Sequence, residues 1–405
     1  MTSKERLMLI LLAALNFTHI LDFMIMMPLG NYLMPYFKIS PQQFTFLVSS
    51  YTISAAVSGF AAAFFVDNYD RKKILLIAYL GFLIGTLACG LAPTFTLLFL
   101  SRTVAGIFGG LIGAQVLSIV ADTFPYERRG MAMGTLMSAF SLASTFGVPF
   151  ALYLANIFSW HAPFLLVGSL GFILIPFLMR YIPSMTSHIH VGATQESKLA
   201  SLTNVLKDKN QYRALIFSGL IMFGHFLIIP FINPYMEFNM GYSKSETPMV
   251  YLVGGVTSFV AANLLGRLSD LYGKLTIFSI CVIVALPMVY AITHMPEIHF
   301  ALILTIFGLW FSVATGRGVT SQAMVSQMVN PEHRGSFQSF NSSIQQLGTG
   351  LASLTAGYIV VKGEGDKILH YDWVGYLSIS VLIVSLLLGR RIFKVIDTKP
   401  ILEKK

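Results

Sequence analysis

The chain has 405 residues, of which 55% are hydrophobic and 11% are charged. A typical soluble domain is about 25% charged, so this composition excludes a soluble globular protein and a disordered one. The two cysteines, Cys89 and Cys281, lie inside apolar stretches and exclude a disulfide framework and a cysteine-rich metal site. We therefore expect a membrane protein that crosses the bilayer many times.

Twelve stretches are long and apolar enough to cross a bilayer as helices of about 20 residues. In chain order they cover residues 7–29, 44–66, 74–92, 95–120, 132–156, 162–182, 213–237, 247–271, 275–293, 299–324, 337–361 and 372–393. The longest polar segment, 183–212, divides them into six and six. We predict an all-α membrane protein with an N-terminal bundle at 1–182, a cytoplasmic linker at 183–212, a C-terminal bundle at 213–393 and a cytoplasmic tail at 394–405.

Positive charge sets the expected orientation. With the N-terminus inside, 21 of the 27 Lys and Arg residues fall in cytoplasmic segments and 4 in outer segments. The other two, Arg102 and Arg317, lie within predicted helices. Both termini are thus expected in the cytoplasm, and the net charge of +9 indicates topology and contact with anionic lipid rather than nucleic-acid binding.

The two halves repeat each other at an offset of about 205 residues. The loop after the second span reads AFFVDNYDRKK at 63–73, and the loop after the eighth reads GRLSDLYGK at 266–274. After the fourth span comes ERRG at 127–130, and after the tenth comes EHRG at 332–335. Two matched loops at nearly equal offset indicate a duplicated six-helix unit.

The loop at 266–274 matches the G-x-x-x-D-x-x-G-[RK] motif of the major facilitator superfamily, and the loop at 63–73 resembles it with two glycines replaced. The fourth span reads R-x-x-x-G at 102–106, and GVP at 147–149 resembles the antiporter motif. With Asp22 and Pro28 in the first span, these features resemble the proton-coupled efflux branch, near the sugar, nucleoside and drug exporters of bacteria. The resemblance implies two pseudo-symmetric bundles that rock about a central cavity.

Asp22 and Arg102 are the first candidates for a functional pair. Each lies seven residues from the predicted outer end of its helix, about 10 Å deep at 1.5 Å per residue. A charge at that depth is costly, so the two are expected to pair. The pair either carries a coupling proton or serves as a structural ion pair between the first and fourth helices.

Two histidines and one arginine complete the ionisable candidates. His19 shares a helical face with Asp22, and His225 occupies the matching position of the second half at an offset of 206. They are either proton carriers, substrate ligands or neutral hydrogen-bonded side chains, and no metal site is predicted. Arg317 has Ile112 at its repeat position, so it either holds a polar or anionic group of a substrate or braces helix ends.

Amides in apolar surroundings are candidates for lining the substrate cavity, or for bonds between neighbouring helices. The candidates are Gln115, Asn233, Asn341 and Gln345.

The repeated loops are candidates for gates. The first would join Asp67, Arg71 and Asp122, and the second would join Gly266, Asp270, Gly273 and Lys274. We interpret both as conformational latches, which form when the inner gate closes and break when it opens.

The chain lacks a G-x-x-x-x-G-K-[ST] phosphate-binding loop and the common hydrolase motifs, so direct ATP coupling, catalysis and a cofactor are not predicted. We predict a monomeric, proton-coupled exporter of a small organic molecule in a bacterial cell membrane, with substrate, protons and lipid as partners. The alternatives are an uptake symporter or uniporter, and a membrane receptor that uses the fold without transport.

Overall fold

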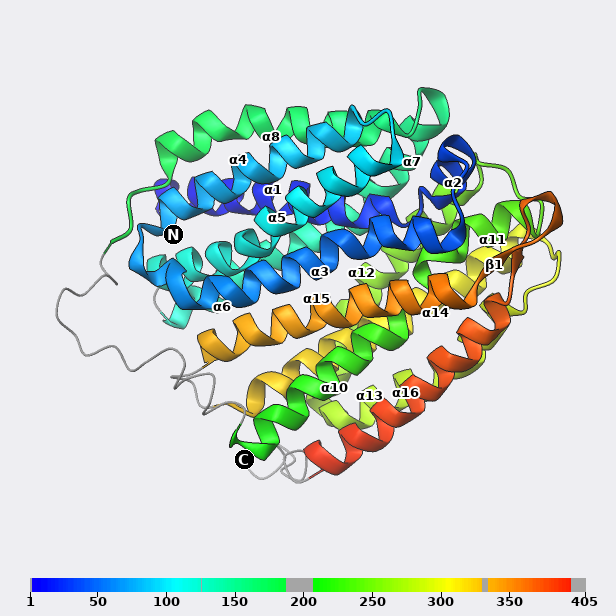
Figure 1. Ribbon diagram of the computed structural model, residues 1–405. Coiled ribbons are helices and arrows are strands. Elements are labelled where there is room, and N and C mark those ends of the chain that lie inside the picture. The colour runs from blue at the N-terminus through cyan, green and yellow to red at the C-terminus, as the bar shows by residue number, and fades with distance from the viewer. Residues whose placement is uncertain (1, 125, 187–206, 330–333, 395–405) are drawn as a thin grey trace.

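The computed structural model describes residues 2–124, 126–186, 207–329 and 334–394, which form a bundle of long helices (Figure 1). The first half contains α1 (Ser3–Met26), α2 (Gly30–Phe37), α3 (Pro41–Phe65), η1 (Val66–Asn68), α4 (Arg71–Gly90), α5 (Phe95–Thr123), α6 (Tyr126–Leu142), η2 (Ala143–Gly147), α7 (Val148–Ile157) and α8 (His161–Tyr181). The second half contains α10 (Lys209–Phe226), η3 (Ile229–Phe231), α11 (Ile232–Phe238), α12 (Thr247–Tyr272), α13 (Lys274–Thr293), α14 (Phe300–Gln327), α15 (Arg334–Ile359) and α16 (Tyr371–Phe393).

Eleven spans in the described residues are long and apolar enough to cross a membrane. The twelfth predicted span is α15, which has 26 residues but a more polar sequence and packs on α3 and α10. Large apolar side chains stay exposed on the outside of the bundle, among them Ile77 at 60% and Leu387 at 63%. A surface of this kind suits lipid, and the predicted helical membrane fold is confirmed.

The first and seventh spans are each broken into two helices, which the sequence did not lead us to expect. The first span does not end at residue 29, because α1 is followed by a turn and then by α2. Pro28 lies in that turn. A proline has no backbone N–H to donate to the carbonyl four residues earlier, and its ring clashes with that carbonyl, so the helix breaks. The seventh span breaks at η3, which contains Pro230.

A short hairpin joins α15 to α16, an addition to the all-α prediction. Its two-residue strands are β1 (Val361–Lys362) and β2 (Ile368–Leu369), and η5 (Glu364–Asp366) lies between them. We call the end of the bundle that carries residues 361–369 the hairpin end. The opposite end, with residues 66–71 and 273–274, is the loop end.

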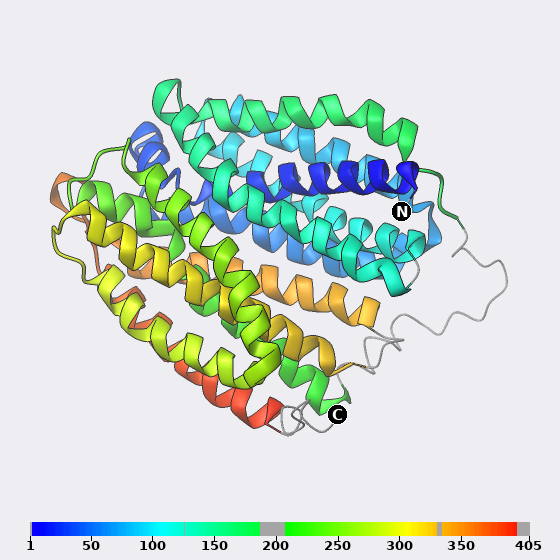
Figure 2. The ribbon, with the colours of Figure 1, turned by 180° about the vertical axis from the view of Figure 1, so that it is seen from behind.

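The two halves meet along α3 and α15, which pack side by side in both views (Figures 1 and 2). Gly357 lies directly against Thr45 near the hairpin end, and Gly59 lies against Ser343 toward the loop end. On the other side of the molecule, α12 packs closely on η2 and α7 and only weakly on α6. On this side the helices of the two halves therefore diverge toward the loop end, whereas α3 and α15 stay in contact there (Figures 1 and 2).

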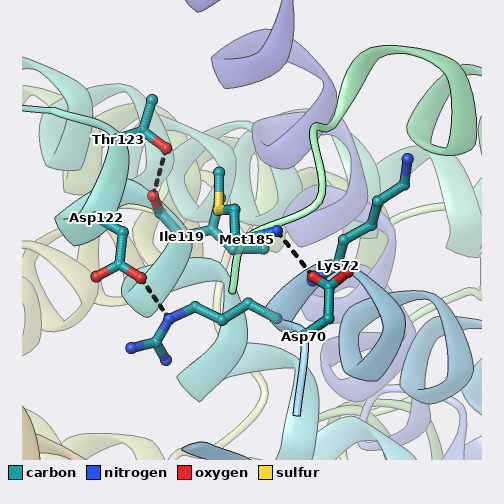
Figure 3. A network of polar contacts seen from close by, with 7 residues as sticks. Asp70, Lys72, Ile119, Asp122, Thr123 and Met185 are labelled. Atoms are coloured by element: carbon teal, nitrogen blue, oxygen red, sulfur yellow. Dashed lines mark hydrogen bonds and ion pairs between the residues drawn. The ribbon is translucent and has the colours of Figure 1, made fainter. Parts of the chain in front are cut away.

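Asp70 anchors the loop between η1 and α4 (Figure 3). Its carboxylate caps α4 by accepting from the Lys72 backbone N–H at 3.0 Å, and it also accepts from Ser184 Oγ at 2.6 Å and from the Met185 N–H at 2.9 Å. Burial of the carboxylate raises its pKa, but these hydrogen bonds outweigh that effect and hold the pKa of Asp70 below its usual range. The aspartate that replaces a motif glycine thus ties α4 to the segment after α8.

Replacing Asp70 with alanine is expected to lower the free energy of unfolding by about 1–2 kcal/mol at neutral pH, because it removes a helix cap and leaves its donors unpaired. Since the folded pKa is depressed, this stabilisation is fully present above the ordinary carboxyl pKa of about 3.9 and is lost as the pH falls through the folded value.

Thermal unfolding in detergent across a pH series measures the effect. Asp270→Ala is the matched control, because Asp270 lies in the last turn of α12, in the corresponding motif of the second half, with its side chain 68% exposed. Equal losses in the two variants would contradict the anchoring role.

Candidate functional site

Asp22 and Arg102 form an ion pair inside the first half, as the matched depth predicted. Arg102 Nη1 lies 2.7 Å from Asp22 Oδ2, and the two side chains are 1% and 0% exposed. The same nitrogen lies 3.5 Å from the Asp22 carbonyl oxygen. The pair joins α1 to α5 in a region that is closed to solvent in this structure.

The R-x-x-x-G pattern on α5 places an aromatic ring on this ion pair. A Cβ at Gly106 would lie 2.3 Å from the Tyr51 carbonyl oxygen, so only glycine lets α3 approach α5 this closely. That approach sets the Tyr51 ring 4.4 Å from the Arg102 guanidinium carbon. A desolvated cation over an aromatic face gains about 2 kcal/mol, which helps to hold Arg102 in an apolar region.

The ion pair leaves two polar atoms unused. Asp22 Oδ1 and Arg102 Nε are buried without a hydrogen-bond partner among the described residues. A buried charge with unsatisfied atoms is costly and sensitive to any change in its partner. Chemically, Oδ1 is the atom that can accept a proton without displacing the Arg102 contact at Oδ2.

His19 and His225 occupy matching positions, yet each packs among the aromatic rings of its own half. His19 lies edge-on to Phe82 at 5.4 Å, and His225 stacks on Trp310 at 5.1 Å. Both ring nitrogens of His19 and Nδ1 of His225 lack partners in the described part of the chain. The described residues contain no group of three or more His, Cys, Asp or Glu side chains placed to hold a metal ion.

Arg317 lies on α14 and is 2% exposed. Its Nε and Nη1 have no partner among the residues that the structure describes. Ile112 fills the equivalent position of the first half. Among the described residues, no carboxylate lies within 4.0 Å of Arg317. The second half therefore contains a buried cation without a counter-ion, whereas Arg102 in the first half is paired with Asp22.

The four amides divide into two kinds. Gln115 Oε1 and both side-chain atoms of Asn341 are buried without a partner in the described residues. Gln345 donates to Ser218 Oγ at 2.8 Å and to Gln322 Oε1 at 3.2 Å, which links α15 to α10 and α14. The structure thus adds Gln322 to a polar cluster that the sequence revealed only in part.

Asn233 belongs to a joint between the halves at the hairpin end. Its Nδ2 donates to the Pro28 carbonyl oxygen at 2.8 Å, across the breaks in the first and seventh spans. Next to it, Asn31 Nδ2 donates to Glu237 Oε2 at 2.5 Å, and Lys244 lies 3.6 Å from the other Glu237 oxygen. We call these contacts the hairpin-end joint.

The joint was missed from the sequence, although a signal existed. Asn31 and Glu237 are 206 residues apart, the same offset as His19 and His225. Residues at equivalent repeat positions that contact each other lie close to the pseudo-twofold axis. Asn31 is fully buried, so the contact closes the end of the bundle that lies beyond Asp22.

A family model identifies the superfamily to which this chain belongs. The model of the Major Facilitator Superfamily matches residues 12–320. The chain belongs to this superfamily.

Its relatives are distant in sequence and similar in shape. The chain is 23% identical to an uncharacterised transporter of this type, YwfA of Bacillus subtilis, over 80% of this chain and 76% of the relative. It is 22% identical to a probable sugar efflux transporter of Helicobacter pylori, over 82% of this chain and 85% of the relative. The fold matches a crystal structure of a bacterial homologue of the human lysosomal transporter Spinster in an inward-facing, occupied conformation. The TM-score is 0.75 at 15% identity, over 99% of this chain and 100% of the other.

Membership makes this chain a transporter that crosses the membrane many times, and it favours transport over catalysis. Transporters of this superfamily bind small molecules and are typically monomeric. The two family loop motifs lie at the loop end.

The first loop motif joins α4 to α5, with Arg71 Nε 2.5 Å from Asp122 Oδ2 (Figure 3). The side chain of Asp67 lies outside the described residues. In the second loop, Lys274 Nζ lies 3.1 Å from Asp270 Oδ1. Gly273 separates α12 from α13 with a φ of 91°, a conformation that glycine adopts without strain, whereas a Cβ at Gly266 would meet nothing within 4 Å.

Replacing Arg102 with methionine is expected to destabilise the protein by about 3–5 kcal/mol, because it leaves the Asp22 carboxylate buried without its counter-ion. The double variant Asp22→Leu with Arg102→Met should recover most of that loss, since no uncompensated charge remains.

Midpoints of thermal unfolding for the purified single and double variants measure the coupling. If the double variant is no more stable than Arg102→Met, packing around Arg102, and not its charge pairing with Asp22, dominates at this site.

Proposed function

We propose that this transporter exports a small organic molecule in exchange for protons, and that Asp22 carries the coupling proton. The observation that carries the proposal is the buried Asp22–Arg102 pair, with one carboxylate oxygen free to take a proton. The named relative from Helicobacter pylori is a probable sugar efflux transporter, which supports export as the direction.

The hairpin end is proposed to face outward. With both termini in the cytoplasm of a bacterial cell, the cytoplasmic segments carry the large excess of Lys and Arg, as the positive-inside rule requires. The hairpin-end joint is then the outer gate, and Asn233 acts in that gate rather than in the substrate cavity. The 183–212 linker is proposed to lie inside, between the two bundles at 1–182 and 213–393.

Proton access follows from the position of Asp22 relative to this gate. Asp22 precedes Pro28 by six residues, less than two helical turns below the break. Separation of Pro28 from Asn233 would admit water from outside toward the carboxylate. Protonation on Oδ1 weakens the attraction to Arg102, and release of the proton on the other side restores it.

The loop-end contacts are proposed to be the opposing gate. Arg71–Asp122 lies within the first half and Asp270–Lys274 within the second, and both pairs are formed in this structure although the halves diverge at this end. Each pair is therefore proposed to brace the gating loop of its own half, and not to tie the two halves together. His19 and His225 are proposed as secondary sites of the proton path, since both are buried with unpartnered nitrogens.

The substrate is proposed to bind between the halves, against Arg317. Gln115, Asn341 and Gln345 are proposed to supply hydrogen bonds there. Arg317 needs a partner, because its buried charge has no counter-ion and its Nε and Nη1 have no hydrogen-bond partner among the described residues. A substrate with an anionic or strongly accepting group satisfies that need.

Asp22→Asn imitates the protonated carboxylate. It is expected to abolish transport driven by a pH gradient while leaving exchange of substrate without a gradient largely intact. The assay is flux in proteoliposomes of a compound found by thermal-shift screening of metabolites and drugs, because binding to the folded state raises its stability.

Asp366→Asn is the matched control, since it makes the same chemical change on the exposed hairpin. Full gradient-driven flux in Asp22→Asn would rule out Asp22 as the coupling site and make His19 or His225 the next candidate. Flux that never depends on the gradient, even in the unmodified protein, would instead favour a uniporter. Binding without flux would favour a receptor.

Arg317→Gln is expected to weaken binding of an anionic compound by at least about tenfold, since a buried charged hydrogen bond contributes about 1.5–3 kcal/mol. Its effect on neutral analogues of the same compound should be smaller. Arg391→Gln, on the exposed end of α16, is the control for loss of positive charge. Equal losses for charged and neutral analogues would contradict a role for Arg317 as an anion ligand.

A further inference from the structure

A groove on the outside of the second half lies far from the proposed transport path. It runs between α13 and α16 at the loop end, where the two helices pack side by side (Figures 1 and 2). Its volume is about 400 Å³, within the range of roughly 300–1,000 Å³ that small-molecule sites occupy. The lining residues are Leu275, Thr276, Ser279, Ile280, Ile283, Arg390 and Lys394.

The groove has an apolar wall on α13 and a basic rim on α16. Ile280 and Ile283 are each 51% exposed and form an apolar wall toward the middle of the bilayer. Arg390 and Lys394 form a basic rim in the last turn and cap of α16, where Arg390 Nε lies 3.5 Å from Ser279 Oγ. Within the described residues, no carboxylate lies within 4.0 Å of either cation.

We infer that this groove binds one anionic phospholipid, with its phosphate between Arg390 and Lys394 and an acyl chain along Ile280 and Ile283. The part of α13 that lines the groove, from Leu275 to Ile283, rises about 12 Å, which is most of the roughly 15 Å of one hydrocarbon leaflet. Basic pockets between transmembrane helices at a membrane surface are suited to lipid head groups.

Charge complementarity and depth favour a lipid over other occupants. The basic rim lies at the end of the span formed by α16, which is where a lipid phosphate is found, and the apolar wall on α13 continues into the hydrocarbon layer. A soluble anion would use only the rim and leave the apolar wall empty. The inference needs only that these helices cross a membrane, so it stands independently of proton coupling.

The test measures binding of phosphatidylglycerol and phosphatidylcholine to the purified full chain by native mass spectrometry. The unmodified protein should retain phosphatidylglycerol in preference. Arg390→Gln with Lys394→Gln should bind it about thirty-fold more weakly, about 2 kcal/mol at 1.4 kcal/mol per factor of ten, the scale of two basic residues at an anionic surface.

Two further variants separate a site from general attraction. Arg391→Gln removes the same charge from the same turn of α16 but from a residue that does not line the groove, so phosphatidylglycerol binding should persist. Ile283→Trp fills the apolar wall without changing charge, so binding should fall. Persistence in the double variant, or equal losses in the double variant and Arg391→Gln, would overturn the inference, as would equal binding of glycerol phosphate.

The thermal unfolding midpoint provides a second readout. Phosphatidylglycerol should raise the midpoint of the unmodified protein and of Arg391→Gln, but not that of the double variant. The midpoints in phosphatidylcholine alone show whether each variant is folded. A phosphatidylglycerol effect that is equal in all variants would show that no defined lipid site exists here.

Discussion

The burial of Asp22 and Arg102 is the constraint on which the first half of this transporter depends. Two opposite charges 2.7 Å apart tolerate burial only while each keeps the other. The close approach of α3 to α5 at Gly106 and the Tyr51 ring over the guanidinium both serve to keep Arg102 in place. A proton that neutralises Asp22 leaves the buried charge of Arg102 without its counter-ion, and so weakens the contact between α1 and α5.

The two halves share a fold but differ in charge. The first half holds a neutralised pair, whereas the second holds Arg317 with unpartnered nitrogens and an isoleucine at the equivalent position of the first. In the proposed mechanism the proton acts on one half and the substrate on the other. The broken helices α1–α2 and α10–α11 meet near the pseudo-twofold axis, where the Asn31–Glu237 hydrogen bond joins the two halves.

The sequence was sufficient for the helical membrane fold, because few architectures other than a duplicated helical bundle combine long apolar segments with a repeated loop. The depth argument also brought Asp22 and Arg102 together correctly, although the first span continues past residue 29. The position of a residue along a helix gives its depth in the membrane, but it does not show toward which neighbouring helix its side chain points. For that reason the engagement of Asn233 with Pro28, and of Gln345 with Ser218 and Gln322, could not be predicted. The repeat offset that relates His19 to His225 also relates Asn31 to Glu237, but only the structure shows that the second pair touches.

Infrared difference spectroscopy of the purified protein in lipid tests the central claim most directly, because it detects a carboxyl group as it gains a proton and needs no substrate. Spectra recorded while the pH is lowered should contain a protonated carboxyl C=O band that is absent in Asp22→Asn and present in Asp366→Asn. The band should shift when Arg102 is replaced by methionine, since its counter-ion is gone. An unchanged band in Asp22→Asn would show that the proton is carried elsewhere and that the buried pair is structural.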